Sequence, residues 1–252
     1  MKQVTLVSLY GQKTGLVAQL IRDCCHMIEK SPLRRVFRAY HPSQMHGTIV
    51  GMEKLIGYSA PFNTNIWSAI GEKVMMGFDQ VLPTLQQHFP MTIQFGGFSP
   101  FFNQFDSFGN LPYERSFQVQ WPTNRFTLIG WPHANGNFTT TRLLNCLRDD
   151  LNVQCNVAHK YSGDNDLFIV LGKIVHLERF TDAEIEQLQE AAKTLEVQIR
   201  NHLAATKTGV TIELDDISLV QYEMETLPLH STISHRVTDP GVTPEFISNL
   251  YG

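Results

Sequence analysis

The alternation of hydrophobic and polar positions predicts two strands and two helices in the first third of the chain. A run of apolar and β-branched residues that ends at Gly11 predicts a buried strand. Apolar positions then recur at helical spacing until Pro32 stops the pattern. A second strand and helix follow, and Pro83 predicts a kink or an early break in that helix. In chain order, the predicted elements are a strand over 3–10, a helix over 13–30, a strand over 46–52 and a helix over about 65–88.

Strand and helix patterns continue to alternate as far as Pro228, after which little periodicity remains. The segment Pro122-Thr123-Asn124 predicts the turn of a hairpin. Thr139 or Thr140 is the predicted cap of one helix, and the capping box Thr181-Asp182-Ala183-Glu184 opens another. The predicted elements are a strand over 91–98, hairpin strands over 116–121 and 125–131, a helix through 143–151, a strand over 166–176, a helix from 181, and a strand over 210–222 that breaks near 215–216.

This order of elements predicts an α+β or α/β fold in which the two halves of the chain resemble each other. Each half contains a strand-helix-strand unit, although no residue-level repeat relates them. No linker-like composition separates the halves. We therefore expect one bilobal domain over residues 1–228, followed by a C-terminal tail over 229–252.

Composition and charge exclude some of the functions that the chain could have. Hydrophobic residues make up 42% of the chain and the net charge is −4, which describes a globular protein without general basic character. A sequence-independent nucleic-acid binder is therefore not expected. Arg34, Arg35 and Arg38 form a local basic group, for which a solvated segment is the plainer interpretation.

The cysteines and the apolar runs add expectations about cofactors and location. Cys24, Cys25, Cys146 and Cys155 form no Cys-x-x-Cys pair, so we expect reduced thiols and no metal or other cofactor. No apolar run approaches the roughly 18 residues of a membrane span. The first residues are too polar for a signal peptide, and we expect a cytoplasmic protein without membrane contact.

The candidate chemistry begins at His46-Gly47-Thr48, on the second predicted strand. Side chains two residues apart share a strand face, so His46 and Thr48 point the same way. A histidine moves a proton near neutral pH, and a hydroxyl holds a phosphoryl oxygen. Together they are half of a phosphoester-cleaving site. A structural histidine is the alternative, because the pattern is short.

Three features together resemble the 2H phosphoesterase superfamily, which includes the LigT-type bacterial RNA 2′,3′-cyclic phosphodiesterases and the 2′-5′ RNA ligase-like proteins. They are the element order with His46-Gly47-Thr48 in place, the apolar run 167–174, and the last strand, 217–223. The resemblance implies a bilobal sheet with two pseudo-symmetric strand-helix-strand lobes around a central cleft. Each lobe of such a protein offers one histidine and one hydroxyl residue, and no metal takes part.

The sequence departs from this pattern in the second half. Phe168 and Val170 occupy the positions that match the second histidine and its hydroxyl partner. Neither side chain transfers a proton or binds a phosphate oxygen. The sequence therefore predicts a 2H-like protein that binds a nucleotide or the phosphate of an RNA terminus, with catalysis impaired or lost.

The candidate site residues follow from this interpretation. His46 and Thr48 are the candidate catalytic residues. Arg38 and Tyr40, shortly before the motif, and His133, in a predicted loop, are the candidate substrate-binding residues.

Other histidines of the chain are candidates to replace the missing second one. His133 is the loop candidate, and His230 begins a second His-x-Thr pattern that chance explains. His176 lies roughly 26 Å from Phe168 along a straight strand, which is too far for it to replace the missing histidine. His41 and His159 are interpreted as ordinary surface histidines.

Two alternative functions remain open. A completed site would make the chain an active, metal-independent phosphodiesterase, a hydrolase acting on 2′,3′-cyclic phosphates, 2′,5′-linked oligomers or cyclic nucleotides. An empty cleft would leave an interaction protein with the same fold, whose protein partner the sequence does not name. The aromatic segment 98–108 fits core packing or an interface better than base stacking, because stacking needs exposed rings.

Overall fold

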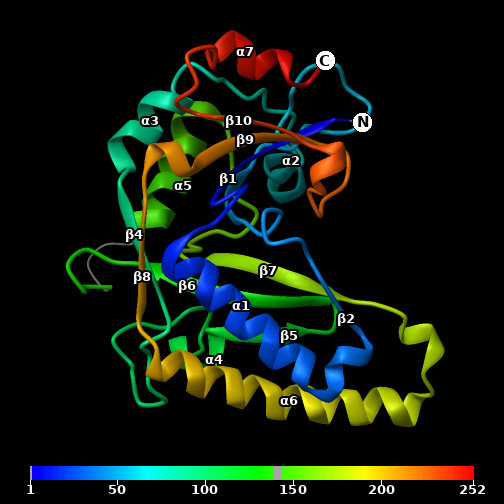
Figure 1. The fold of residues 1–252 in the computed structure, drawn as a ribbon. Coiled ribbons are helices and arrows are strands. Elements are labelled where there is room, and N and C mark those ends of the chain that lie inside the picture. Colours follow the sequence, from blue (N-terminus) through cyan, green and yellow to red (C-terminus); the bar gives the residue numbers. More distant parts are fainter. Residues whose placement is uncertain (1, 139–142) are drawn as a thin grey trace.

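Ten strands pair into one antiparallel sheet in the described part of the chain, which gives a mixed α+β fold (Figure 1). The structure is a computed structural model that describes residues 2–138 and 143–252. The strand order is β10-β9-β1-β3-β7-β6-β4-β8, with β2 paired to β7 and β5 paired to β6. The strands are β1 (Gln3–Ser8), β2 (Phe37–Ala39), β3 (Gly47–Gly51), β4 (Met91–Phe95), β5 (Phe117–Gln120), β6 (Arg125–Pro132), β7 (Leu167–Ile174), β8 (Thr208–Ile212), β9 (Ile217–Tyr222) and β10 (Ile233–Arg236).

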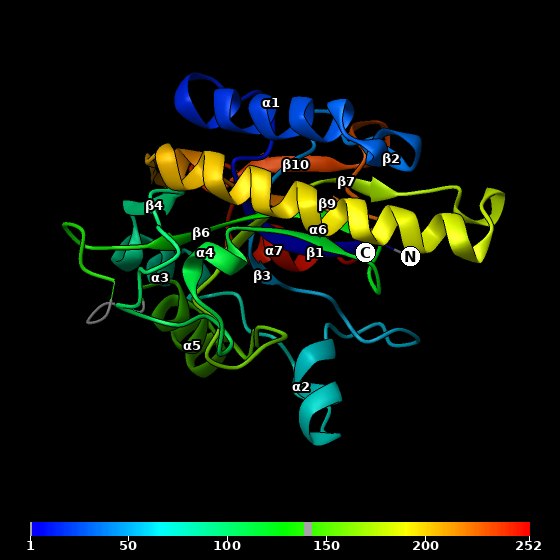
Figure 2. The same cartoon turned by 90° about the horizontal axis from the view of Figure 1, so that it is seen from below.

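Helices cover the sheet in two groups. α1 and α6 run side by side along the half that contains β5, β6 and β7, as Figures 1 and 2 show. α3 and α5 pack together at the other end of the sheet. The described α-helices are α1 (Gly15–Lys30), α2 (Thr64–Ile70), α3 (Val81–His88), α4 (Pro112–Arg115), α5 (Leu143–Cys155), α6 (Asp182–Ala205) and α7 (Pro244–Asn249).

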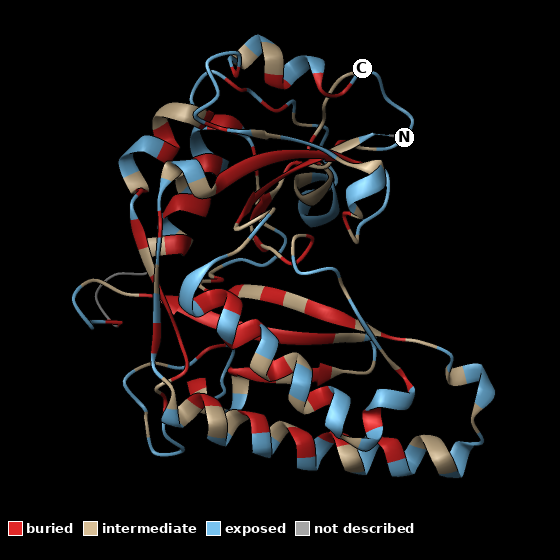
Figure 3. Ribbon diagram, viewed as in Figure 1, coloured by how far each residue is buried: buried red, intermediate tan, exposed pale blue. Residues whose placement is uncertain are grey.

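The capping box predicted at Thr181 begins the longest of these helices, α6. The Thr181 hydroxyl accepts a hydrogen bond from the Glu184 amide at 3.4 Å, and the Glu184 carboxylate accepts one from the Thr181 amide at 3.0 Å. Figure 3 shows buried positions along the side of α6 that faces the sheet. Their spacing is helical: Leu188, Ala192, Leu195, Ile199 and Leu203.

The single helix predicted over 65–88 is wrong, because two short helices and a loop occupy that range. Gly71 ends α2 in the left-handed conformation, with φ of 72°, which glycine adopts without steric cost. Pro83 lies in the first turn of α3, where a missing backbone N–H breaks no helical hydrogen bond. The proline that predicted a kink therefore sits near a helix start.

The C-terminal segment 229–252 joins the sheet, although its sequence shows little periodicity. β10 adds an edge strand beside β9, and α7 follows it. Ile247 and Tyr251 are buried, and the Tyr251 hydroxyl donates a 2.6 Å hydrogen bond to the Met52 carbonyl. The two candidate caps of α5, Thr139 and Thr140, lie outside the described residues.

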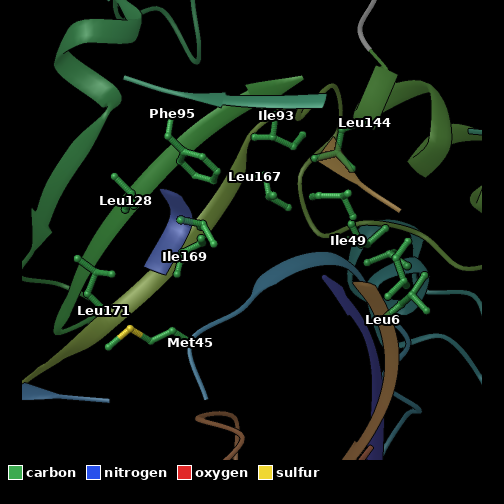
Figure 4. Close-up of a cluster of buried hydrophobic side chains, with 14 of the residues drawn as sticks. Leu6, Met45, Ile49, Ile93, Phe95, Leu128, Leu144, Leu167, Ile169 and Leu171 are labelled. Atoms are coloured by element: carbon green, nitrogen blue, oxygen red, sulfur yellow. The ribbon is translucent and has the colours of Figure 1, made fainter. Parts of the chain in front are cut away.

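The two halves of the sheet meet where β3 pairs with β7, at Gly47 and Ile169. One hydrophobic cluster continues across this junction (Figure 4). It joins Leu6 and Ile49 on one side to Leu128 and Ile169 on the other. The halves consequently share one core.

A buried arginine on α5 connects the two strands just beyond their pairing. Arg148 donates to the carbonyls of Thr48 at 3.1 Å and Ile49 at 2.8 Å, next to the end of the β3–β7 pair. The same guanidinium donates to the carbonyls of Asp164 at 2.8 Å and Asp166 at 3.2 Å, just before β7 begins. The Asp164 carboxylate lies 3.3 Å from it and balances its charge. Arg148 thus satisfies backbone acceptors of both halves at once.

The first prediction concerns this arginine. We expect Arg148→Met to lower the free energy of unfolding by about 3–5 kcal/mol, because it leaves the buried Asp164 carboxylate without its counter-charge and several buried carbonyls without a donor. Arg179→Met is the matched control: that side chain is 68% exposed, and its loss is expected to cost at most about 0.5 kcal/mol. Urea denaturation measures both values. Equal, small losses in the two variants would contradict the role given to Arg148.

Candidate functional site

A cavity of about 690 Å³ opens over the junction of the two halves. Side chains from five strands form its floor, and its walls come from α2 and from the segments 108–125, 159–166 and 222–227. The floor residues are Thr5 of β1, Thr48 of β3, Ile129 of β6, Phe168 of β7 and Tyr222 of β9.

A β-bulge in β3 decides which side chains reach this cavity. Val7 of β1 pairs with Thr48, but its neighbour Leu6 pairs with Val50, so Ile49 is the extra residue. Ile49 and Val50 are both buried in the core. The cavity side of the strand therefore carries His46 and Thr48 and then, beyond the bulge, Gly51 and Glu53. Strict alternation would have put residues 50 and 52 there instead.

His46 lines the cavity as a partly buried, neutral ring. Its Nδ1 lies 2.8 Å from the Gln44 carbonyl oxygen; because a carbonyl only accepts, Nδ1 carries the proton and Nε2 keeps its lone pair. Burial lowers the pKa of His46 to about 4, the bond to Gln44 opposes this, and the charge of Lys13 lowers it further. The edge of the Tyr10 ring packs against the imidazole, with the ring centroids 5.9 Å apart. At neutral pH the ring is therefore an acceptor.

Phe168 faces the same cavity from the neighbouring strand. The antiparallel pairing of Gly47 with Ile169 sets Phe168 across from Thr48. The Phe168 ring also packs against a hydrophobic cluster of three aromatic residues and one isoleucine, called here the aromatic cluster: Phe98, Ile129, Trp131 and Phe138. Val170 is half-buried and follows on the same side of β7, but it is not among the residues that line the cavity.

Arg125 is a partly exposed cation of the site, and the sequence did not single it out. It lines the cavity, and its guanidinium lies 3.6 Å from the carboxylate of Glu225, which is 84% exposed. Such an exposed pair contributes little stability and leaves the cation open to another anion. Tyr40 lies close enough for the charge of Arg125 to lower its pKa, although burial dominates and raises that pKa to about 12.

A protonatable carboxyl group occupies the far end of the β3 face. The Tyr222 hydroxyl donates a 2.6 Å hydrogen bond to Glu53. Burial raises the pKa of Glu53, and the bond from Tyr222 partly opposes that rise. Gly51 makes room for this carboxyl group, because a Cβ at that position would lie 2.1 Å from Glu53 Oε2. Neither Glu53 nor Gly51 was a candidate from the sequence.

His159 corrects the sequence interpretation, which placed it on the surface. Its side chain is only 9% exposed, and its Nε2 lies 3.0 Å from an Asp164 carboxylate oxygen. It lines the cavity next to Asp166. The Asp166 carboxylate accepts hydrogen bonds from Trp131 Nε1 at 2.6 Å and from Arg115 at 2.5 Å. A loop histidine becomes buried here because the segment before β7 folds over Arg148.

The other candidates from the sequence lie away from the cavity lining. Arg38 is exposed on β2, and Arg35 pairs with Glu184 at the start of α6. The His133 ring packs against Phe138, and its Nδ1 accepts a hydrogen bond from the Gly136 amide at 3.0 Å. His230 lies in the segment before β10 and does not reach the lining.

Within residues 2–138 and 143–252, no group of three or more His, Cys, Asp or Glu side chains is arranged to hold a metal ion. The cysteines are free thiols. Across the same residues, no helix combines the length and the apolar character that crossing a membrane requires.

Comparisons with known proteins assign neither a family nor an activity. No family model matches the chain, and no curated protein matches it. Among solved structures, it is similar to a conserved protein of unknown function from Agrobacterium tumefaciens strain C58, ATU0111. That similarity has a TM-score of 0.45 at 11% sequence identity and covers 94% of this chain and 86% of the other.

A second prediction tests the position of the Glu53 carboxyl group beside Gly51. We expect Gly51→Ala to lower the free energy of unfolding by about 1–3 kcal/mol, because the new methyl group displaces a packed carboxyl group. Gly209→Ala on β8 is the control, since a Cβ there meets nothing within 4 Å. Thermal or urea unfolding compares the two. If Gly51→Ala were as harmless as the control, Glu53 would not be held where the structure places it.

A third prediction follows from the depressed pKa of His46. Between pH 6.5 and about 4 the unfolded chain takes up a proton that folded His46 resists, so folding stability falls as the pH drops through this window. Wild type should therefore lose more stability than His46→Gln between pH 7 and pH 4.5. Urea denaturation at both pH values measures the difference, and NMR titration of the imidazole signal gives the pKa directly. An identical pH dependence in both proteins would refute the assignment.

Proposed function

We propose that this chain is a 2H-phosphoesterase-like protein that binds a nucleotide or the phosphate of an RNA terminus, with catalysis impaired or lost. One observation carries the proposal: His46 and Thr48 share one strand face and line a cavity with Arg125 and Phe168. The cavity, at about 690 Å³, lies within the range of about 300–1,000 Å³ found for small-molecule sites.

The side chains at the His46 end supply complementary contacts for a phosphate group. The Thr48 hydroxyl donates to a non-bridging oxygen, and Arg125 supplies a positive charge. Neutral His46 accepts from a ribose hydroxyl through Nε2, whereas its imidazolium form donates to a phosphate oxygen through the same atom. An anion bound beside the ring favours the imidazolium form. Phosphate binding is then coupled to proton uptake by His46.

Phe168 is the reason to expect weak catalysis or none. Phosphodiester cleavage of the 2H type needs one group that accepts a proton and another that donates one. The ring that lies across from Thr48 does neither. Because a positioned acid or base contributes about 10²–10⁴-fold, its loss leaves a site that binds better than it turns over.

A second candidate function has one observation in its favour. His159 lines the same cavity, and its hydrogen bond to Asp164 fixes the ring as a carboxylate orients a catalytic histidine. If His159 reaches a phosphate held at Thr48, the chain is an active, metal-independent phosphodiesterase. The experiment below separates this outcome from binding alone.

The fourth prediction is a binding experiment. Calorimetry with a 2′,3′-cyclic nucleotide and a 2′,5′-linked oligomer, without metal, should detect binding to wild type. Thr48→Val should weaken it about 10- to 150-fold, since a hydrogen bond to a charged group contributes about 1.5–3 kcal/mol. His46→Gln should weaken it as well. Thr92→Val on β4 and the exposed His41→Gln change residues outside the cavity lining, and both should bind as wild type does.

The same samples, analysed for products, decide between the functions. Binding without turnover is the result expected here. Turnover that His46→Gln abolishes would establish the phosphodiesterase. Absence of binding and turnover would contradict both and leave an interaction protein that keeps the fold alone.

A further inference from the structure

One wall of the cavity contains a row of four side chains in contact, called here the Arg115–His159 wall: Arg115, Phe108, Tyr161 and His159. The Arg115 guanidinium carbon lies 5.1 Å from the centre of the Phe108 ring. Phe108 meets Tyr161 at a centroid distance of 6.3 Å, and Tyr161 meets His159 at 6.2 Å. All four residues line the cavity.

Two polar atoms in this wall are buried without a hydrogen-bond partner in the described residues: Arg115 Nε and His159 Nδ1. The other nitrogens that anchor these side chains are engaged. An Arg115 terminal nitrogen donates to Asp166, and His159 Nε2 lies 3.0 Å from Asp164 Oδ2. Because a carboxylate only accepts, Nε2 carries the His159 proton and Nδ1 is an acceptor. Arg115 Nε–H is a donor. Buried polar groups without partners are costly, so each side chain gains a hydrogen bond if it turns toward a polar ligand in the cavity.

The aromatic members of the wall differ from the other rings of the 98–108 segment. Phe98 is 1% exposed inside the aromatic cluster, with Phe102 and Phe105 packed against it. By contrast, Phe108 is 53% exposed and Tyr161 is 49% exposed, and both face the cavity. The expectation of core packing for this segment holds for Phe98, Phe102 and Phe105, whereas Phe108 presents an open ring surface to the cavity. Exposed rings of this kind are what base stacking requires.

We propose that the Arg115–His159 wall binds a nucleobase. The two rings are inclined at 77° to each other, so the base stacks on the face of one and meets the other ring at its edge. The polar edge of the base faces Arg115 and His159, and a rotation of these side chains toward the cavity brings Arg115 Nε–H and His159 Nδ1 to it. This inference rests on the proposed function for the phosphate end of the ligand, and it names the ligand as a nucleotide rather than a simple phosphate ester. Every base has a flat π-face and an edge with both donors and acceptors. A free sugar has neither the aromatic face nor the planar edge.

Free nucleosides test this wall without involving the phosphate end. Full-length protein is titrated with adenosine, guanosine, cytidine and uridine, followed by NMR, with ribose as the probe without a base. At least one nucleoside should bind, and ribose should not. Tyr161→Ala and Phe108→Ala should each weaken nucleoside binding about 5- to 150-fold, the range for loss of one stacking ring.

Matched controls separate stacking from general damage. Tyr58 is 38% exposed and Phe101 is 89% exposed, and neither lines the cavity. Tyr58→Ala and Phe101→Ala should therefore bind nucleosides as wild type does. Circular dichroism confirms that all four variants fold. His159→Ala should also change the order of preference among the four nucleosides, which a purely structural role would leave unchanged.

The outcomes distinguish this inference from the proposed function. If no nucleoside binds, if ribose binds equally well, or if the controls lose as much affinity, the nucleobase wall is wrong. Nucleotide binding that still depends on Thr48 would then leave the phosphate proposal standing. Conversely, nucleoside binding that needs Tyr161, together with nucleotide binding that ignores Thr48, would support the wall and overturn the phosphate site.

Discussion

The architecture of this chain depends on the hydrogen bonds of one buried guanidinium. Arg148 lies at the point where β3 and β7 stop pairing, called here the fork. It donates hydrogen bonds to backbone carbonyls of β3 and of the segment just before β7. Burial lowers the pKa of Arg148 to about 10, and Asp164 and Asp166 oppose that change, so the side chain stays charged at neutral pH. A cation held this way lets two strands separate without leaving buried acceptors unpaired. The cavity occupies the sheet face at this fork.

Two local features near the fork decide which side chains line the cavity: a bulge in β3 and the contacts of Asp164. The bulge at Ile49 turns β3 so that Glu53 joins the face that carries His46 and Thr48. On the other side, one oxygen of Asp164, Oδ2, lies close to both Arg148 and His159. The ion pair that closes the fork therefore also fixes a cavity histidine. The junction of the two strands and the candidate functional residue His159 are therefore coupled. A substitution of Arg148 is expected to disturb both.

The sequence predicted the elements well and the site only in part. Local patterns located the strands around 3–10 and 46–52 and the capped helix from Thr181. The first strand is a continuous apolar run because it is buried on both faces, and the helix buries one stripe at helical spacing. The site needed information that no local pattern holds. In the sequence, Arg148 looks like an ordinary solvent-facing residue of a helix. Nothing near it in the chain reveals its partners, two of which are carbonyls about 100 residues away. Glu53 reaches the cavity only through a bulge that alternation does not reveal, and His159 is buried by a loop that folds over Arg148. The sequence does identify His46 and Thr48, because local alternation along one strand is enough to place both on the same face.

The proposed function depends above all on phosphate binding at the β3 face of the cavity, through His46 and Thr48. The most direct measurement is a crystal structure of the chain with a bound 2′,3′-cyclic nucleotide. We expect phosphate oxygens within hydrogen-bonding distance of Thr48 Oγ1 and His46 Nε2, on the cavity side of the Phe168 ring. A nucleotide whose phosphate lies away from both side chains would contradict it.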